Sequence, residues 1–211
     1  MDALRRLADA LGAPDSPLTV QEAVTHSYDE GKLTRQSAGA ITARLLPENA
    51  IVSDEAGTSG GPFWDCCASA PQHDWMVITG GSIGQGLPLA TGAAVACPDR
   101  KVIALQADGS GMFTVQALWT MAREKLDVTT IIMKNESYGI LNIELGRVGI
   151  DNPGPKALAL LDLTNPSLDW VSISEGMGVP AVRAETSGEF HDALADALAD
   201  PGPRLIEAVL R

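Results

Sequence analysis

Two short motifs in the middle of the chain carry side chains that could hold a divalent cation. Asp108 lies in the segment Ala107-Asp108-Gly109-Ser110, and Asn135 follows 27 positions later. Asp108 offers a carboxylate, Asn135 a side-chain carbonyl, and Ser137 a backbone carbonyl as a third oxygen. Hard cations such as Mg²⁺ bind oxygen ligands of this kind and complete their shell with water and substrate phosphates. The sequence therefore predicts a metal site formed by Asp108, Asn135 and Ser137.

The residues that follow Asp108 suit a phosphate group. Gly109 and Ser110 come directly after an apolar, strand-like run (102–105) and just before a helix-like segment. Backbone N–H groups at the start of a helix point toward bound anions, and the helix dipole favours negative charge there. Asp108 has an alternative role as a helix N-cap, which is common for Asp at a strand–helix junction. The spacing to Asn135 favours the metal role.

The stretch from Thr79 to Gly149 resembles the C-terminal, diphosphate-binding (PP) domain of thiamine diphosphate-dependent enzymes. The branch it resembles contains benzoylformate decarboxylase and the acetolactate synthase large subunit, and weaker similarity extends over 47–211. The family usually has Gly at the position of Ala107 and often a second Asn at that of Lys134, but neither difference removes a ligand. The motifs that carry the resemblance are Gly80-Gly81-Ser82-Ile83-Gly84, Leu87-Pro88, Ala107-Asp108-Gly109-Ser110, Gln116-Ala117-Leu118-Trp119 and Asn135-Glu136-Ser137-Tyr138-Gly139.

The resemblance implies that the chain binds thiamine diphosphate together with Mg²⁺. In the family, the backbone carbonyl at the Gly81 position accepts a hydrogen bond from the cofactor's aminopyrimidine, and the apolar residue at the Ile83 position supports its bent shape. The contacts implied for the diphosphate are Gly109, Ser110, Tyr138 and Gly139, with Gly57 and Thr58 as further cofactor contacts. For Tyr138 and Gly139 the alternative is simple turn chemistry. We interpret the neighbouring Glu55 as a solvated loop carboxylate.

The resemblance also implies a missing component. Family members activate the cofactor with a glutamate from a separate pyrimidine-binding domain, and the sequence before residue 50 is too short to form one. We therefore expect half of an active site, which needs a pyrimidine-binding domain or subunit carrying that glutamate and acts on a 2-oxo acid. No catalytic residue is identified in this chain. The surface that would pair with the missing domain predicts a homo-oligomer.

The predicted function is the diphosphate- and Mg-binding domain of a 2-oxo acid decarboxylase or an acetolactate synthase-like carboligase. Two alternatives remain open at this point. One is a cofactor-binding or interaction module of the same fold that performs no catalysis. The other is an α/β protein that binds a different nucleotide or phosphate.

The composition limits the partners of the chain. A formal charge of −12 and an isoelectric point near 4.5 argue against nucleic acid, because phosphate backbones require a basic surface. Three cysteines without a C-x-x-C pair suit a reducing compartment. No apolar stretch is long enough to span a membrane, and the start of the chain does not look like a signal peptide. We therefore expect a cytoplasmic protein with neither a membrane nor nucleic acid as a partner.

Alternating strand and helix patterns predict an α/β fold, a parallel sheet with helices on both faces. We expect a helical arm and linker over 1–18 and the thiamine diphosphate-binding domain over 19–211. Ligands of such sheets bind at the carboxyl ends of the strands, where Asp108 and Asn135 fall. The predicted strands are 50–53, 76–79, 102–105, 128–133, 181–184 and 205–209. The predicted helices are 2–11, one starting after a Thr19 cap, 87–97, 112–124, 167–177 and 188–199.

Two segments carry more specific expectations. In the helix over 112–124, the spacing of Val115, Leu118, Trp119 and Ala122 predicts one apolar face. The stretch 141–166 is rich in Gly, Pro and Asn and is predicted to be a long loop. A loop of that length is either functional or disordered, and a lid over the cofactor and a plain surface loop are both open.

Overall fold

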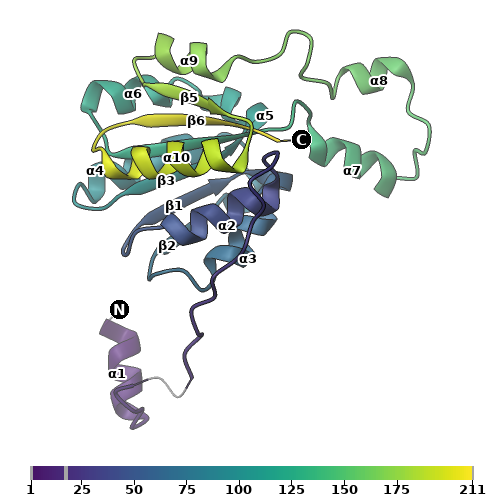
Figure 1. Cartoon of the computed structure of the whole chain (residues 1–211). Helices are drawn as coiled ribbons and strands as arrows, with labels where there is room; N and C mark the ends of the chain where they lie inside the picture. Colours follow the sequence, from purple (N-terminus) through teal and green to yellow (C-terminus); the bar gives the residue numbers. More distant parts are fainter. Residues whose placement is uncertain (1, 17–18, 211) are drawn as a thin grey trace.

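The computed structural model describes residues 2–16 and 19–210 and contains a six-stranded sheet in which every strand pair is parallel (Figure 1). The strand order is β2-β1-β3-β4-β6-β5. This arrangement confirms the predicted α/β class. The strands are β1 (Ile51–Glu55), β2 (Asp74–Val77), β3 (Val102–Ala107), β4 (Val128–Lys134), β5 (Ala181–Ala184) and β6 (Arg204–Val209).

Helices cover both faces of the sheet and enclose two separate cores. One core lies against α2, α3 and α10 and is built around Ile41, Phe63 and Phe190. The other lies against α4, α6 and α9 and includes Leu118 and Trp170. The α-helices are α1 (Asp2–Ala10), α2 (Arg35–Leu45), α3 (Gly61–Cys67), α4 (Gly86–Ala96), α5 (Asp108–Gly111), α6 (Ala117–Glu124), α7 (Gly139–Arg147), α8 (Pro155–Ala159), α9 (Trp170–Gly176) and α10 (Ser187–Ala199).

The central strands explain why the sheet is buried on both sides. Every residue of β4 is buried, and β3 is buried over its first five residues. Successive side chains of a strand point to opposite faces, so Ile103 enters one core and Ala104 the other. Continuous apolar strands of this kind are typical of parallel sheets covered by helices. None of the described helices is long and apolar enough to cross a membrane.

The helical region expected between Thr19 and Pro47 begins only at Arg35, as α2, so the predicted start after Thr19 is wrong. Residues 19–29 have no regular secondary structure, and Val20 and Val24 are exposed. A capping pattern alone does not stabilise a short helix, since most helical stability in proteins comes from packing an apolar face. The predicted N-terminal helix is present as α1, and no residue of α1 is buried. The boundary predicted at 18/19 falls partly on residues 17–18, which lie outside the described residues.

Two other expectations differ from the structure. The predicted helix over 112–124 is divided into a 3₁₀ turn (Met112–Thr114) and α6, and its buried face consists of Ala117, Leu118 and Met121. Trp119 is 51% exposed and lies under the guanidinium of Arg123. The predicted loop over 141–166 contains most of α7 and all of α8. These helices project from the sheet as an arm (Figure 1).

A buried ion pair connects β4 with β6 beside the second core. Glu207 is fully buried, and its carboxylate lies 2.8 Å from Lys134 Nζ and 2.8 Å from Arg183 Nε. Lys134 is almost completely buried and also donates to the backbone carbonyl of Leu168 at 2.7 Å. Arg183 is partly exposed to water, so its pairing contributes less to stability.

We predict that Glu207→Gln lowers the free energy of unfolding by about 3 kcal/mol, because it removes the buried counter-charge of Lys134 and leaves only the longer contact with the partly exposed Glu136 at 3.6 Å. Urea denaturation followed by circular dichroism measures this change. Asp200→Asn is the control, because it removes the exposed pair with Arg204 and should change stability by less than about 0.5 kcal/mol. Equal effects of the two substitutions would contradict the assignment of Glu207 as a buried anchor.

Candidate active site

The candidate site lies at the carboxyl ends of three adjacent strands. The strand order reverses direction between β1 and β3, and Glu55 ends β1 while Asp108 directly follows β3. Asn135 directly follows β4, the next strand in the sheet. In open parallel sheets, ligands bind in the crevice outside the strand ends at such a reversal. The topology therefore brings the two predicted metal ligands to one edge.

Asp108 is a buried carboxylate held by backbone N–H groups. It is 1% exposed, its Oδ2 accepts the N–H of Glu136 at 2.7 Å, and its Oδ1 accepts the N–H of Gly109 at 3.0 Å. Burial raises the pKa of Asp108, while these hydrogen bonds and the charge of Lys134 act in the opposite direction. Ala107, and not Asp108, occupies the N-cap position of α5. Because Glu136 directly follows Asn135 in the chain, the hydrogen bond from its N–H holds the Asp108 carboxylate against the segment that contains Asn135.

Asn135 and Ser137 form a compact turn beside Asp108. Asn135 Oδ1 accepts the N–H of Ser137 at 3.0 Å, and the Ser137 carbonyl accepts the N–H of Gly139 at 2.9 Å. Each of these oxygens has a second lone pair, so each can also face a cation. No group of three or more His, Cys, Asp or Glu side chains in the described part of the chain could hold a metal. One carboxylate and two neutral oxygens nevertheless fit Mg²⁺, which keeps positions for phosphate and water.

The predicted phosphate contacts lie close together around two glycines. A Cβ atom at Gly109 would be 2.6 Å from a ring carbon of Tyr138, so this ring lies directly against the glycine backbone. A Cβ atom at Gly139 would be 3.0 Å from Thr58 Oγ1 and 3.7 Å from Asn135 Nδ2. The structure therefore brings the 3₁₀ turn Gly57–Ser59 against the segment that contains Asn135, although the two are far apart in sequence.

Ser110 and Gly57 differ in what they can offer a ligand. The Ser110 hydroxyl is engaged by the protein, with the carbonyls of Glu55 and Ala107 at 3.2 and 3.1 Å. A phosphate would therefore meet its backbone N–H, at the start of the short helix α5. Gly57 has a φ of +56°, which favours glycine in the tight turn before Thr58.

The two residues predicted to hold the pyrimidine lie in the loop after β2. Gly81 ends a 3₁₀ turn (Thr79–Gly81) with a φ of +72°, and its carbonyl accepts the N–H of Ile83 at 2.9 Å. Ile83 is 48% exposed. An exposed isoleucine in a glycine-rich loop at the carboxyl edge of the sheet is available to a ligand, whereas a core residue would not be.

The interpretation of Glu55 as a solvated loop carboxylate is wrong. It is 2% exposed, because β1 extends to Glu55 and carries its side chain into the sheet interior. Its carboxylate accepts the backbone N–H groups of Gly84 and Gly86 and the side-chain amide of Gln106. Sequence reasoning missed this role because the three donors lie 29 to 51 residues away.

Arg35 is a second residue that sequence reasoning missed. It begins α2, and its Nη1 donates to the carbonyl of Thr58 at 2.8 Å. The sequence around it carries no local signal for this contact. A hollow of about 440 Å³ next to it is lined by Thr34, Arg35, Thr58, Ser59, Asn135 and Leu210.

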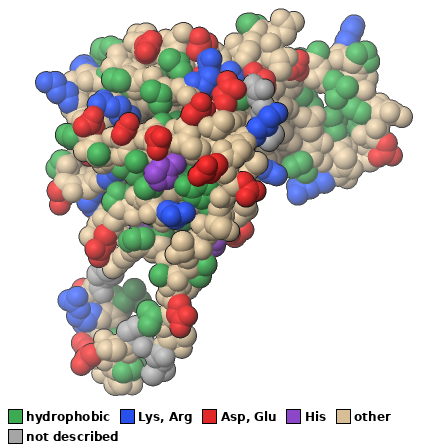
Figure 2. Space-filling view, viewed as in Figure 1, with side chains coloured by type: hydrophobic (Ala, Val, Ile, Leu, Met, Phe, Trp, Pro, Cys, Tyr) green, Lys and Arg blue, Asp and Glu red, His purple; other side chains and the backbone are tan. Residues whose placement is uncertain are grey.

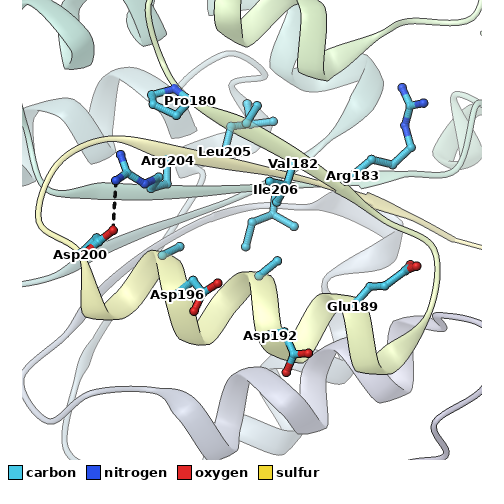
Figure 3. Close-up of a pocket in the computed structure, with 13 residues that line it drawn as sticks. Pro180, Val182, Arg183, Glu189, Asp192, Asp196, Asp200, Arg204, Leu205 and Ile206 are labelled. Atoms are coloured by element: carbon cyan, nitrogen blue, oxygen red, sulfur yellow. Dashed lines mark hydrogen bonds and ion pairs between the residues drawn. The ribbon is translucent and has the colours of Figure 1, made fainter.

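Other features of the surface and interior do not belong to the site. Cys66 and Cys67 are buried on α3, and burial raises the pKa of the Cys67 thiol to about 12, so Cys67 remains a protonated core side chain. A hollow of about 420 Å³ between α10 and the strands β5 and β6 contains none of the predicted site residues (Figure 3). Acidic and basic side chains alternate over the face shown in Figure 2, without one sign gathering there.

Comparison with known proteins places this arrangement in a family. Residues 55–208 match the family described as "Thiamine pyrophosphate enzyme, C-terminal TPP binding domain". The chain is 53% identical over 210 residues to the Mycobacterium tuberculosis protein named "Putative acetolactate synthase large subunit IlvX" (99% of this chain, 41% of that protein). It is 35% identical over 178 residues to the benzoylformate decarboxylase of Pseudomonas aeruginosa (84% of this chain, 32% of that protein).

A solved structure agrees with these sequence matches. The thiamine diphosphate-dependent 4-hydroxybenzoylformate decarboxylase of Rhodococcus jostii RHA1 superposes with a TM-score of 0.81 at 30% identity, over 100% of this chain and 39% of that chain. The present chain thus spans 32 to 41% of the length of these relatives. It belongs to the thiamine pyrophosphate enzyme family, as a C-terminal TPP-binding domain.

Proposed function

We propose that this chain binds the diphosphate end of thiamine diphosphate through Mg²⁺ and forms half of the active site of a 2-oxo acid decarboxylase or acetolactate synthase-like carboligase. One observation carries the proposal. The carboxylate of Asp108 is buried at a strand end, where a hydrogen bond from the N–H of Glu136 holds it beside Asn135. Two backbone hydrogen bonds and the charge of Lys134 offset the cost of burying this carboxylate only in part, so a cation bound beside it would stabilise it further.

The proposed roles follow the position of each residue. Asp108, Asn135 and the Ser137 carbonyl bind Mg²⁺, which compensates the charge of the diphosphate. The turn at Gly57 and Thr58, the start of α5 at Gly109 and Ser110, and the segment at Tyr138 and Gly139 surround the phosphates. Gly81 and Ile83 hold the pyrimidine end. When bound, the cofactor supplies a nucleophilic carbon and an electron sink for the loss of CO₂ from a 2-oxo acid.

The chain needs a partner to complete the site. We infer that a pyrimidine-binding domain or subunit provides the activating glutamate. In the proposed roles, no acid or base of this chain lies at the pyrimidine end of the cofactor. Exposed apolar side chains close to the site support such a partner. They include Ile83 and Phe113 beside Gly84, and Ile140, Leu141 and Ile143 on α7. We also propose that the protein self-associates and works in the cytoplasm.

We predict that Asp108→Asn weakens binding of thiamine diphosphate in the presence of Mg²⁺ by about 100-fold or more. The substitution keeps the shape of the side chain but removes the charged ligand, and losing even an outer-shell group at a metal site costs roughly 10- to 100-fold. Isothermal titration calorimetry with and without EDTA measures the change. Asp99→Asn, an exposed substitution in the turn after α4, is the control and should bind like the wild type. Unchanged affinity in Asp108→Asn would refute the metal assignment.

We further predict that the chain alone releases no CO₂ from pyruvate or benzoylformate, because in the proposal a separate pyrimidine-binding domain or subunit supplies the activating glutamate. Adding the part of the M. tuberculosis relative that this chain does not cover, which in the proposal supplies the activating glutamate, with Mg²⁺ and thiamine diphosphate, should restore release of CO₂ from a 2-oxo acid. Replacing the activating glutamate of that part by Gln should abolish it again. Cofactor binding without turnover in any mixture would favour the non-catalytic module. Binding of ATP or NAD in preference to thiamine diphosphate would contradict the proposed function.

A further inference from the structure

We propose that Glu55 is a positioning residue, which holds the loop for the pyrimidine end of the cofactor at a fixed place relative to the turn for the diphosphate end. The inference rests on the proposed function and adds to it a residue that touches neither end of the ligand. It acts through the loop 79–86 and through α5.

The carboxylate of Glu55 lies where three segments meet. Oε1 accepts the N–H of Gly84, and Oε2 accepts the N–H of Gly86 at 2.7 Å. Gln106 Nε2 donates to the same Oε2 at 3.2 Å. These partners belong to the loop that carries Gly81 and Ile83, to the start of α4, and to β3. One side chain from β1 therefore fixes the loop against the sheet.

A carboxylate suits this position because every polar group around it is a hydrogen-bond donor. Its three partners are all donors, and two of them are backbone N–H groups, one at the positive end of the eleven-residue helix α4. Hydrogen bonds of N–H groups to a carboxylate are roughly twice as strong as those between neutral groups. A neutral amide in the same place would turn its NH₂ group toward one of the donors and leave a buried N–H without a partner, which is costly.

A second set of contacts extends this arrangement to the diphosphate end. Gln106 is fully buried, and its Oε1 lies 3.4 Å from the Ser110 hydroxyl. The backbone carbonyl of Glu55 lies 3.2 Å from the same hydroxyl, whose single hydrogen can donate to one of these oxygens or to the Ala107 carbonyl. Gly86 leaves no room between these groups, because a Cβ atom there would lie 2.1 Å from Gln106 Nε2. Glu55 and Gln106 thus join the loop around Ile83 to the turn that begins with Asp108.

Binding of two ligands can distinguish a positioning role of Glu55 from a general effect on protein stability. Mg-pyrophosphate reaches only the diphosphate end, whereas Mg-thiamine diphosphate also needs the loop at Gly81 and Ile83. We expect Glu55→Gln to weaken the binding of Mg-thiamine diphosphate by about 10- to 100-fold, comparable to the loss of an outer-shell group. The affinity for Mg-pyrophosphate should stay as in the wild type, because this ligand does not reach the loop. Calorimetry on the whole chain measures both ligands.

The control is another carboxylate-to-amide change away from the site. Asp127 precedes β4 at the opposite edge of the sheet, where it pairs with Lys101 and accepts the N–H of Gly202. Asp127→Asn should leave the ratio of the two affinities as in the wild type. If Glu55→Gln does not fold, Gln106→Met serves in its place. It keeps both backbone hydrogen bonds of Glu55 and should change the ratio in the same direction by a smaller factor.

Hydrogen exchange tests the positioning without any ligand. Amides of the loop 79–86 should exchange faster in Glu55→Gln than in the wild type, while those of β3 and β4 keep their protection. Unchanged exchange in this loop, or an equal loss of affinity for both ligands, would overturn the inference. If the wild-type chain binds neither ligand, the proposed function fails, and the exchange of the loop still decides the role of Glu55.

Discussion

In the parallel register of β1, β3 and β4, Glu55 lies opposite Gln106, and Ala107 lies opposite Met133. The three strands thus end at nearly the same level, and the residues that follow them emerge side by side. Parallel strands require crossover connections, so polar groups more than twenty residues apart meet at one edge. A shift of one residue in this register would turn the Glu55 side chain to the opposite face and separate Asp108 from Asn135. The site depends on this register before it depends on any single ligand.

Two buried carboxylates at this edge have different surroundings, and the difference separates their roles. Glu55 is surrounded by donors that saturate it, from two backbone N–H groups and one amide. Asp108 is held by two backbone N–H groups, and one of them belongs to Glu136, which lies between Asn135 and Ser137 in the chain. The Asn135 side-chain oxygen and the Ser137 carbonyl are neutral oxygens in the adjacent segment. The first arrangement stabilises the protein itself, and the second suits an added metal ion.

Sequence patterns predicted the sheet well because buried parallel strands are continuous apolar runs with clear ends. The same logic placed Asp108 and Asn135 at one edge. Other features depend on contacts that no local pattern contains. Glu55 looks solvated until Gly84 and Gly86 are brought against it, and Arg35 carries no signal for the Thr58 carbonyl. Trp119 has helical spacing that suits a core position, yet Met121 occupies that face. The capping pattern at Thr19 failed because its valines have no core to enter.

Several apolar side chains around the site are exposed to solvent. Ile83 directly precedes Gly84, Phe113 lies against Gly84, and both side chains are exposed. Ile140, Leu141 and Ile143 are exposed on α7, which begins at Gly139 beside Thr58. Monomeric proteins rarely expose large apolar patches unless they serve an interaction. Chemistry on a bound cofactor also requires exclusion of water, which strengthens every charge interaction at the site. In the proposed function, one partner surface covers these side chains and encloses the cofactor. Binding of this partner would then bury these exposed apolar side chains and complete the active site in one step.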